Sequence, residues 1–161
     1  MRTIDAPIQV ACVALLCAAL AACGGGGKPV PAQPAPPPAE LHVGALHIRA
    51  STVNTTLLPE QVTRQYGIAR GEQTWMLLVT VRTGKDEASE TSMPANVEAF
   101  ARDLQGRRIE IPLRELETAQ GLVDHVGTFS IAPPDTLQFT VQVTPQGGPT
   151  RTLEFAREVA R

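Results

Sequence analysis

The sequence predicts an all-β domain, an immunoglobulin-like antiparallel β-sandwich of about seven strands with one short helix, over residues 41–161. Apolar and polar residues alternate with a period of two along most segments beyond Glu40, as in strands with one buried face. Clusters of Pro, Gly, Asp and Gln separate these segments as turns. A chain of 161 residues has room for one compact domain.

The first predicted strand covers residues 41–50, and its apolar positions change phase by one residue next to Gly44. A β-bulge at Gly44 would account for this change. Residues 75–81 form an almost unbroken apolar run. Such a run is typical of a central strand covered on both faces.

A short helix is predicted at residues 59–66, between these two strands. It would have Pro59 at its first position, an acidic residue in its first turn and Gly67 beyond its end. Val62 and Tyr66 lie four residues apart and would share its buried face.

The second half of the chain offers five further segments, four of which are predicted as strands from their pattern alone. Residues 95–104 match a helix and a strand template equally well, so the pattern leaves both open. Residues 108–114 alternate as a strand, with a hairpin turn at residues 105–107 before it. Residues 137–143 form the clearest strand, and flanking turns predict a three-stranded meander with residues 129–131 and 153–155.

The N-terminal residues predict export and lipidation. The apolar run from Ile8 to Ala22 is shorter than the roughly 20 residues of a membrane-spanning helix and fits a secretion signal. Leu20-Ala21-Ala22-Cys23 resembles the lipobox of bacterial lipoprotein signals, in which cleavage precedes a cysteine that is then acylated. We therefore predict a lipoprotein signal peptide at residues 1–22, the alternative being an ordinary secretory signal in which Cys23 is incidental.

Residues 23–40 are predicted to be the lipidated Cys23 followed by a Gly- and Pro-rich linker. Gly24 occupies the position where aspartate would signal inner-membrane retention in enteric bacteria. The prediction is therefore a lipid anchor in the cell membrane, at the outer membrane and facing the periplasm. The membrane is the predicted partner through Cys23, and a protein of the envelope is the expected second partner.

Composition argues against several function classes. The net charge is −2, whereas a nucleic-acid binder is expected to be strongly positive, so no nucleic-acid partner is predicted. All three cysteines precede the domain, so neither a disulfide nor a cysteine nucleophile is predicted within it. The serines lack a Gly-X-Ser-X-Gly context. We predict no enzymatic activity, no catalytic residue and no cofactor.

The three histidines and one acidic loop are the remaining candidates for metal binding. His42 and His47 are an odd number of residues apart and would face opposite sides of a strand, unless a bulge at Gly44 brought them together. His125 shares parity with core positions of its strand. The acidic residues at 86, 87 and 90 lack the ligand spacing of a calcium loop and predict a solvated loop. No metal site is predicted.

Several stretches are similar to a known family. They begin with Asn54-Thr55-Thr56-Leu57-Leu58-Pro59-Glu60-Gln61-Val62 and Tyr66-Gly67-Ile68, and continue with Asp103-Leu104-Gln105-Gly106, Ala132-Pro133-Pro134, Leu137-Gln138-Phe139 and Leu153-Glu154-Phe155. In this order they resemble the domain-of-unknown-function 4426 family of small exported bacterial proteins. The resemblance implies a cleavable signal, an all-β sandwich and a strand at residues 95–104, and it supplies no catalytic residue. Lipidation on a long linker departs from the family's pattern.

Taken together, these features predict a lipid-anchored envelope protein with a non-enzymatic interaction or structural role. The alternative is a periplasmic protein that binds a small ligand or a metal through its histidines. The candidate interaction or structural residues lie in one segment: Asn54, Thr56, Pro59 and Tyr66.

Overall fold

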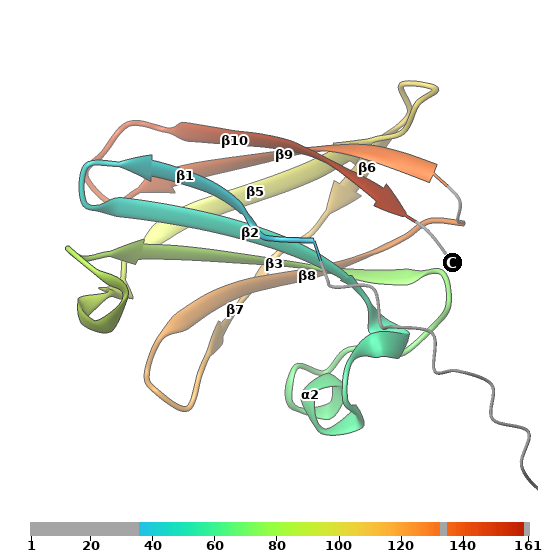
Figure 1. The fold of residues 1–161 in the computed structure, drawn as a ribbon, viewed down its shortest axis with the longest axis horizontal. Helices are drawn as coiled ribbons and strands as arrows, with labels where there is room; N and C mark the ends of the chain where they lie inside the picture. The colour runs from blue at the N-terminus through green and yellow to red at the C-terminus, as the bar shows by residue number, and fades with distance from the viewer. Residues whose placement is uncertain (1–35, 133–134, 160–161) are drawn as a thin grey trace, which may run out of the picture. The chain divides into compact units, whose positions relative to one another are not determined.

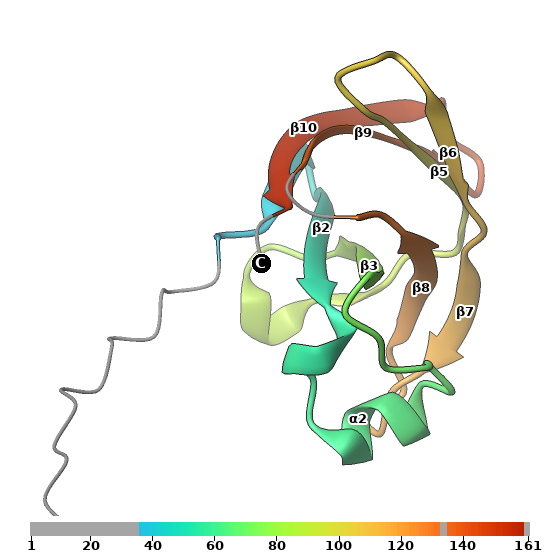
Figure 2. The same ribbon diagram turned by 90° about the vertical axis from the view of Figure 1, so that its right-hand side faces the viewer.

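The computed structural model describes residues 36–132 and 135–159. The predicted signal peptide, Cys23 and most of the predicted linker lie outside the described residues. The described chain forms two antiparallel sheets that pack face to face (Figures 1 and 2). The predicted all-β sandwich is therefore confirmed.

The larger sheet has six strands, in the order β1 (Ala39–Val43), β2 (Leu46–Asn54), β3 (Thr74–Thr83), β8 (Val123–Ser130) and β7 (Arg114–Glu117), with β4 (Thr91–Ser92) paired to β3. The smaller sheet has the order β10 (Arg151–Val159), β9 (Asp135–Pro145), β5 (Ala95–Arg102) and β6 (Arg108–Ile111). Three short helices complete the described structure: η1 (Thr55–Leu57), α2 (Glu60–Gln65) and η2 (Glu87–Ser89).

The core lies between the two sheets, because each sheet directs its alternate apolar residues inward. Leu77, Val79 and Val81 of β3 are buried, and they belong to the same cluster as the inward residues of β9. Phe139 is fully buried and stacks on Phe155 at a ring-centroid distance of 5.0 Å. The alternating pattern therefore identified most of the core correctly.

The first predicted strand is two strands. Gly44 has a φ of +61° in the two-residue turn between β1 and β2, and the two strands pair with His42 directly opposite His47. The bulge predicted at Gly44 is wrong, because a tight hairpin turn produces the same one-residue change of phase. The hairpin places both histidines on the same side of the sheet.

The strand predicted at residues 108–114 is also two strands, which lie in different sheets. β6 ends at Ile111 and β7 begins at Arg114, and Pro112 between them has no N–H to continue the ladder. The predicted meander is wrong for a related reason: β8 belongs to the larger sheet, whereas β9 and β10 pair in the smaller one. Together with β4, the two divided strands raise the count from about seven to ten in the described residues.

The predicted helix is present as α2, with Pro59 in the N-cap position. Its buried residue is Thr63, whereas Val62 and Tyr66 are half-buried. The predicted buried face was therefore wrong at Val62, although Tyr66 does pack against a small second cluster of Ile68, Met76 and Val126. Residues 95–102 form β5, so the ambiguous segment is a strand.

Candidate functional site

The connection from β2 to β3, residues 55–73, carries most of the predicted candidate residues and projects from one end of the sandwich (Figure 1). Its framework is held by Thr55, which is fully buried. The Thr55 hydroxyl donates to the carbonyl of Thr74 at 3.0 Å and accepts from the N–H of Gly71 at 3.0 Å. This buried hydroxyl therefore ties the start of the connection to its end.

Asn54 fixes the turn that follows. Its side-chain oxygen accepts from the backbone N–H of Thr56 at 2.9 Å, and its amide nitrogen donates to the carbonyl of Glu72 at 2.8 Å. Arg70 donates to the carbonyl of Thr56 at 2.5 Å. Held in this way, Leu57 at the tip keeps 76% of its surface exposed.

The four predicted residues thus have different surroundings along one segment. Asn54 caps η1, and Tyr66 packs against the second cluster. Thr56 and Pro59 are exposed. The sequence did not single out Leu57, because Leu57 and Leu58 are adjacent leucines and the sequence does not indicate which of them is exposed.

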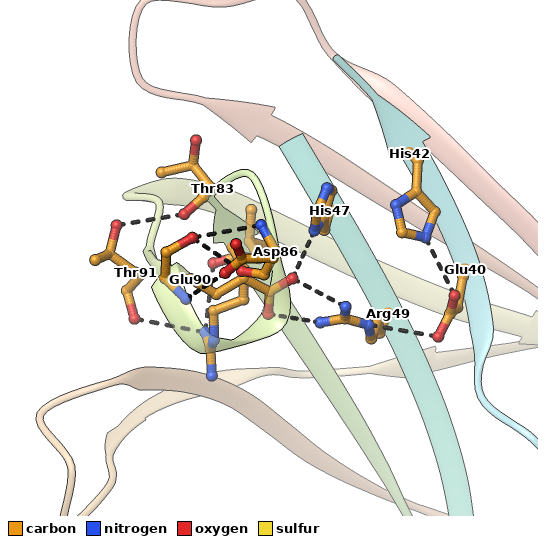
Figure 3. A network of polar contacts seen from close by, with 12 residues as sticks. Glu40, His42, His47, Arg49, Thr83, Asp86, Glu90 and Thr91 are labelled. Atoms are coloured by element: carbon orange, nitrogen blue, oxygen red, sulfur yellow. Dashed lines mark hydrogen bonds and ion pairs between the residues drawn. The ribbon is translucent and has the colours of Figure 1, made fainter. Parts of the chain in front are cut away.

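A second polar group lies on the outer side of the β1–β2 hairpin (Figure 3). We call it the histidine cluster, and it consists of Glu40, His42, His47, Arg49 and Glu90. The hairpin pairs Glu40 with Arg49 and His42 with His47, and Glu90 reaches the cluster from the loop before β4. The imidazole ring centroids of His42 and His47 are 4.5 Å apart, with the ring planes tilted by 53°.

Glu90 is the most buried carboxylate of the histidine cluster, with 8% of its side chain exposed. It accepts two hydrogen bonds from the guanidinium of Arg49, at 2.8 and 2.9 Å, and one from Nδ1 of His47 at 2.5 Å. The bonds from Arg49, and after them the bond from His47, lower the pKa of Glu90 to about 2. Glu90 is therefore a fixed anion, and the solvated loop predicted for it is wrong.

Each histidine of the cluster donates one ring N–H to a carboxylate. His47 donates from Nδ1 to Glu90, and His42 donates from Nε2 to Glu40 at 3.1 Å, since a carboxylate can only accept. The bond from His42 lowers the pKa of Glu40. The opposite ring nitrogens, Nδ1 of His42 and Nε2 of His47, have no hydrogen-bond partner among the described residues.

His125 lies apart from this group. It is buried in β8 opposite Val79, and burial lowers its pKa. In residues 36–132 and 135–159, no three or more His, Cys, Asp or Glu side chains converge on a point that could hold a metal ion. No helix in this part of the chain is long and apolar enough to cross a membrane.

Comparison with known protein families matches residues 40–160 to DUF4426, a domain of unknown function. A solved structure of a DUF4426 family protein from Pseudomonas aeruginosa PAO1 is similar, with a TM-score of 0.65 and 24% identity, over 76% of this chain and 94% of that one. The match and the structure agree with the resemblance found in the sequence. At this identity the structural likeness shows the fold.

Two solved structures of FetP from uropathogenic Escherichia coli strain F11 are also similar. The protein as isolated has a TM-score of 0.55 and 8% identity, over 76% of this chain and 95% of that one. A copper-bound variant of the same protein has a TM-score of 0.52 and 12% identity, over 78% of this chain and 98% of that one. These likenesses again show the fold alone. No curated protein matches the chain.

Proposed function

The chain belongs to the DUF4426 family, and from this premise we propose that it is a lipid-anchored protein of the bacterial cell envelope that acts by binding and not by catalysis. The anchor is Cys23, at the end of the sequence Leu20-Ala21-Ala22-Cys23, and the anchored domain faces the periplasm from the outer membrane. Acyl chains on Cys23 would hold the protein firmly, because each buried methylene contributes about 0.8 kcal/mol. The linker beyond Cys23 allows the domain to reach a partner in the envelope.

The observation that carries the binding function is the rigid presentation of Leu57. Hydrogen bonds that involve the side chains of Asn54, Thr55 and Arg70 hold the turn that carries Leu57, yet 76% of Leu57 remains exposed. Covering a leucine side chain contributes about 1.5–3 kcal/mol. A preorganised apolar tip would lose little conformational entropy on binding, which favours contact with a protein partner.

Site-specific photo-crosslinking in living cells tests the contact. Position 57 should crosslink to one envelope protein, whereas position 104 should not, although Leu104 is similarly exposed at 73%. The Leu57→Asp variant should weaken the same complex by about tenfold or more, because it loses the contribution of about 1.5–3 kcal/mol from covering the leucine side chain. Equal labelling from both positions would contradict the proposal.

The anchor is tested separately by Cys23→Ser. This variant should leave the membrane fraction, because it cannot be acylated. Retention of the Cys23→Ser protein in membranes after a high-salt wash would exclude the lipid anchor.

A second candidate function is metal binding in the periplasm, and the histidine cluster favours it. His42 and His47 lie side by side, and each retains one ring nitrogen without a partner among the described residues. The likeness to FetP, one of whose structures is copper-bound, is compatible with this candidate. Titration of the full chain with metal ions tests it.

A further inference from the structure

We propose that His42 and His47 together bind one copper(II) ion, through Nδ1 of His42 and Nε2 of His47, with water completing the coordination. This inference deepens the second candidate function and rests on it. The two residues face each other across the β1–β2 hairpin, so the backbone of a rigid element sets their spacing. Figure 3 shows the two rings side by side on the outer face of the hairpin.

Both rings are oriented as histidine ligands usually are. In metal sites, the ring nitrogen that does not bind the metal commonly donates to a carboxylate, which fixes the tautomer and makes the other nitrogen more basic. Here Glu90 accepts from Nδ1 of His47 and Glu40 accepts from Nε2 of His42. The two remaining nitrogens therefore carry the lone pairs that a metal requires.

The distance between the rings is compatible with a right angle at a shared metal ion. With metal–nitrogen bonds of about 2.0 Å, two imidazoles at a right angle have centroids about 4.5 Å apart, against about 5.1 Å at a tetrahedral angle and about 6.3 Å in a linear arrangement. The centroids of His42 and His47 are 4.5 Å apart. A right angle is the arrangement of square-planar and tetragonal sites, which are typical of copper(II) and nickel(II) and not of zinc.

The charges around the pair are compatible with a cation. Arg49 is the guanidinium within the histidine cluster, and it is paired with both Glu90 and Glu40. Arg82, opposite His47 on β3, is paired with Asp124. The histidine cluster thus has two carboxylates for one guanidinium, and its net charge favours a bound cation.

Copper(II) is favoured over the other divalent metals by affinity as well. Two imidazoles with water form a nitrogen and oxygen site, at which first-row divalent metals follow an order that peaks at copper. His42, with 49% of its side chain exposed, gives the metal access from solvent, whereas 13% of His47 is exposed. The exposed side of the pair leaves room for the water ligands.

Copper(II) titration of the purified full chain, without a histidine tag, tests the site by calorimetry and electron paramagnetic resonance. We expect one copper ion per chain, with a tetragonal spectrum that shows coupling to two nitrogens. His42→Ala and His47→Ala should each weaken binding by more than about 100-fold, since loss of a histidine's carboxylate partner alone typically costs about 10–100-fold. Glu40→Gln should weaken copper binding by about 10–100-fold, because it removes only the carboxylate partner of His42. His125→Gln is the matched control and should bind copper normally.

The outcomes separate the site from the function. Tight binding that survives both His42→Ala and His47→Ala would overturn the site while leaving metal binding in place. Absence of binding to the unmodified chain would overturn both. Zinc bound more tightly than copper would overturn the assignment of the metal. Thermal unfolding of each variant is measured in parallel, and His42→Ala is the decisive variant, because the exposed His42 has no part in the core.

Discussion

Glu90 connects the loop before β4 to the hairpin, through Arg49 and His47. Its partners are 41 and 43 positions away in the sequence. No local pattern could have predicted this contact, because the acidic residues around it have the composition of a solvated loop. Asn54 differs in this respect, since its bond to the N–H of Thr56 is local and follows from the preference of asparagine for helix caps.

The first prediction concerns acid unfolding. The pKa of Glu90 is about 2 in the folded protein, below its ordinary value of 4.5. Its contribution to stability is therefore fully present above pH 4.5 and is lost as the pH falls from about 4.5 to about 2. Glu90→Gln should lower the free energy of unfolding by about 1–3 kcal/mol at neutral pH. It should also flatten the acid limb, which is the fall in the free energy of unfolding between about pH 4.5 and about pH 2.

Urea unfolding between pH 2 and 7 measures the effect. Glu60→Gln is the matched control, because Glu60 pairs with Arg64 on the exposed surface of α2. Such a pair contributes only about 0.3–0.5 kcal/mol, so this variant should keep the acid limb of the unmodified protein. An acid limb of unchanged slope in Glu90→Gln would show that Glu90 does not stabilise the fold.

At the level of elements, the alternating pattern predicted the strands well and their connections poorly. A bulge and a two-residue hairpin both shift the phase by one residue at Gly44, and Gly-Ala is not among the strongest hairpin signals. The position of the histidine pair follows from that turn. The sequence therefore identified the two histidines as candidates, but it could not predict that they lie on the same side of the sheet.

The crossing from β6 to β7 provides a prediction at the same level. Gly127 of β8 lies so close to it that a Cβ atom there would be 2.6 Å from the carbonyl oxygen of Pro112 and 2.9 Å from a methyl group of Leu113. Gly127→Ala should therefore lower the free energy of unfolding by about 1–3 kcal/mol, the usual cost of overpacking. Gly148→Ala is the control, since its Cβ would approach no described atom closer than 3.6 Å. Equal midpoints in urea for the two variants would contradict the close packing.

At the level of the whole molecule, the fold class could be predicted because it depends on features repeated along the chain. Alternation over many segments outweighs an error at any one turn, and the stretches that carry the family resemblance, from Asn54 to Phe155, lie within the match at residues 40–160. The assignment of strands to sheets could not be predicted, because residues 129–131 and 137–143 have the same pattern whether they pair or lie in opposite sheets.

The beginning of the domain is the last prediction. β1 starts at Ala39, before the predicted boundary at Leu41, and Arg157 of β10 donates to the carbonyl of Pro37 at 2.6 Å. A chain that begins at Pro36 should therefore fold with the full stability of the domain, whereas one that begins at Leu41 loses the pairs of Ala39 and Glu40 with β2. At about 0.5–1.5 kcal/mol for each net hydrogen bond, the shorter chain should be less stable by about 1–3 kcal/mol.

Urea unfolding compares the two chains, and both should give far-ultraviolet circular dichroism typical of β-structure. Arg157→Ala in each chain isolates the contact with Pro37, because this substitution should cost more stability in the longer chain. Its other contacts, with the carbonyl of Ala156 and the ring of Phe155, are common to both chains and cancel in the comparison. Identical losses in the two chains would mean that the contact with Pro37 does not stabilise the fold. Equal stability of the two unsubstituted chains would mean that residues 36–40 do not contribute, and the domain would then begin at Leu41.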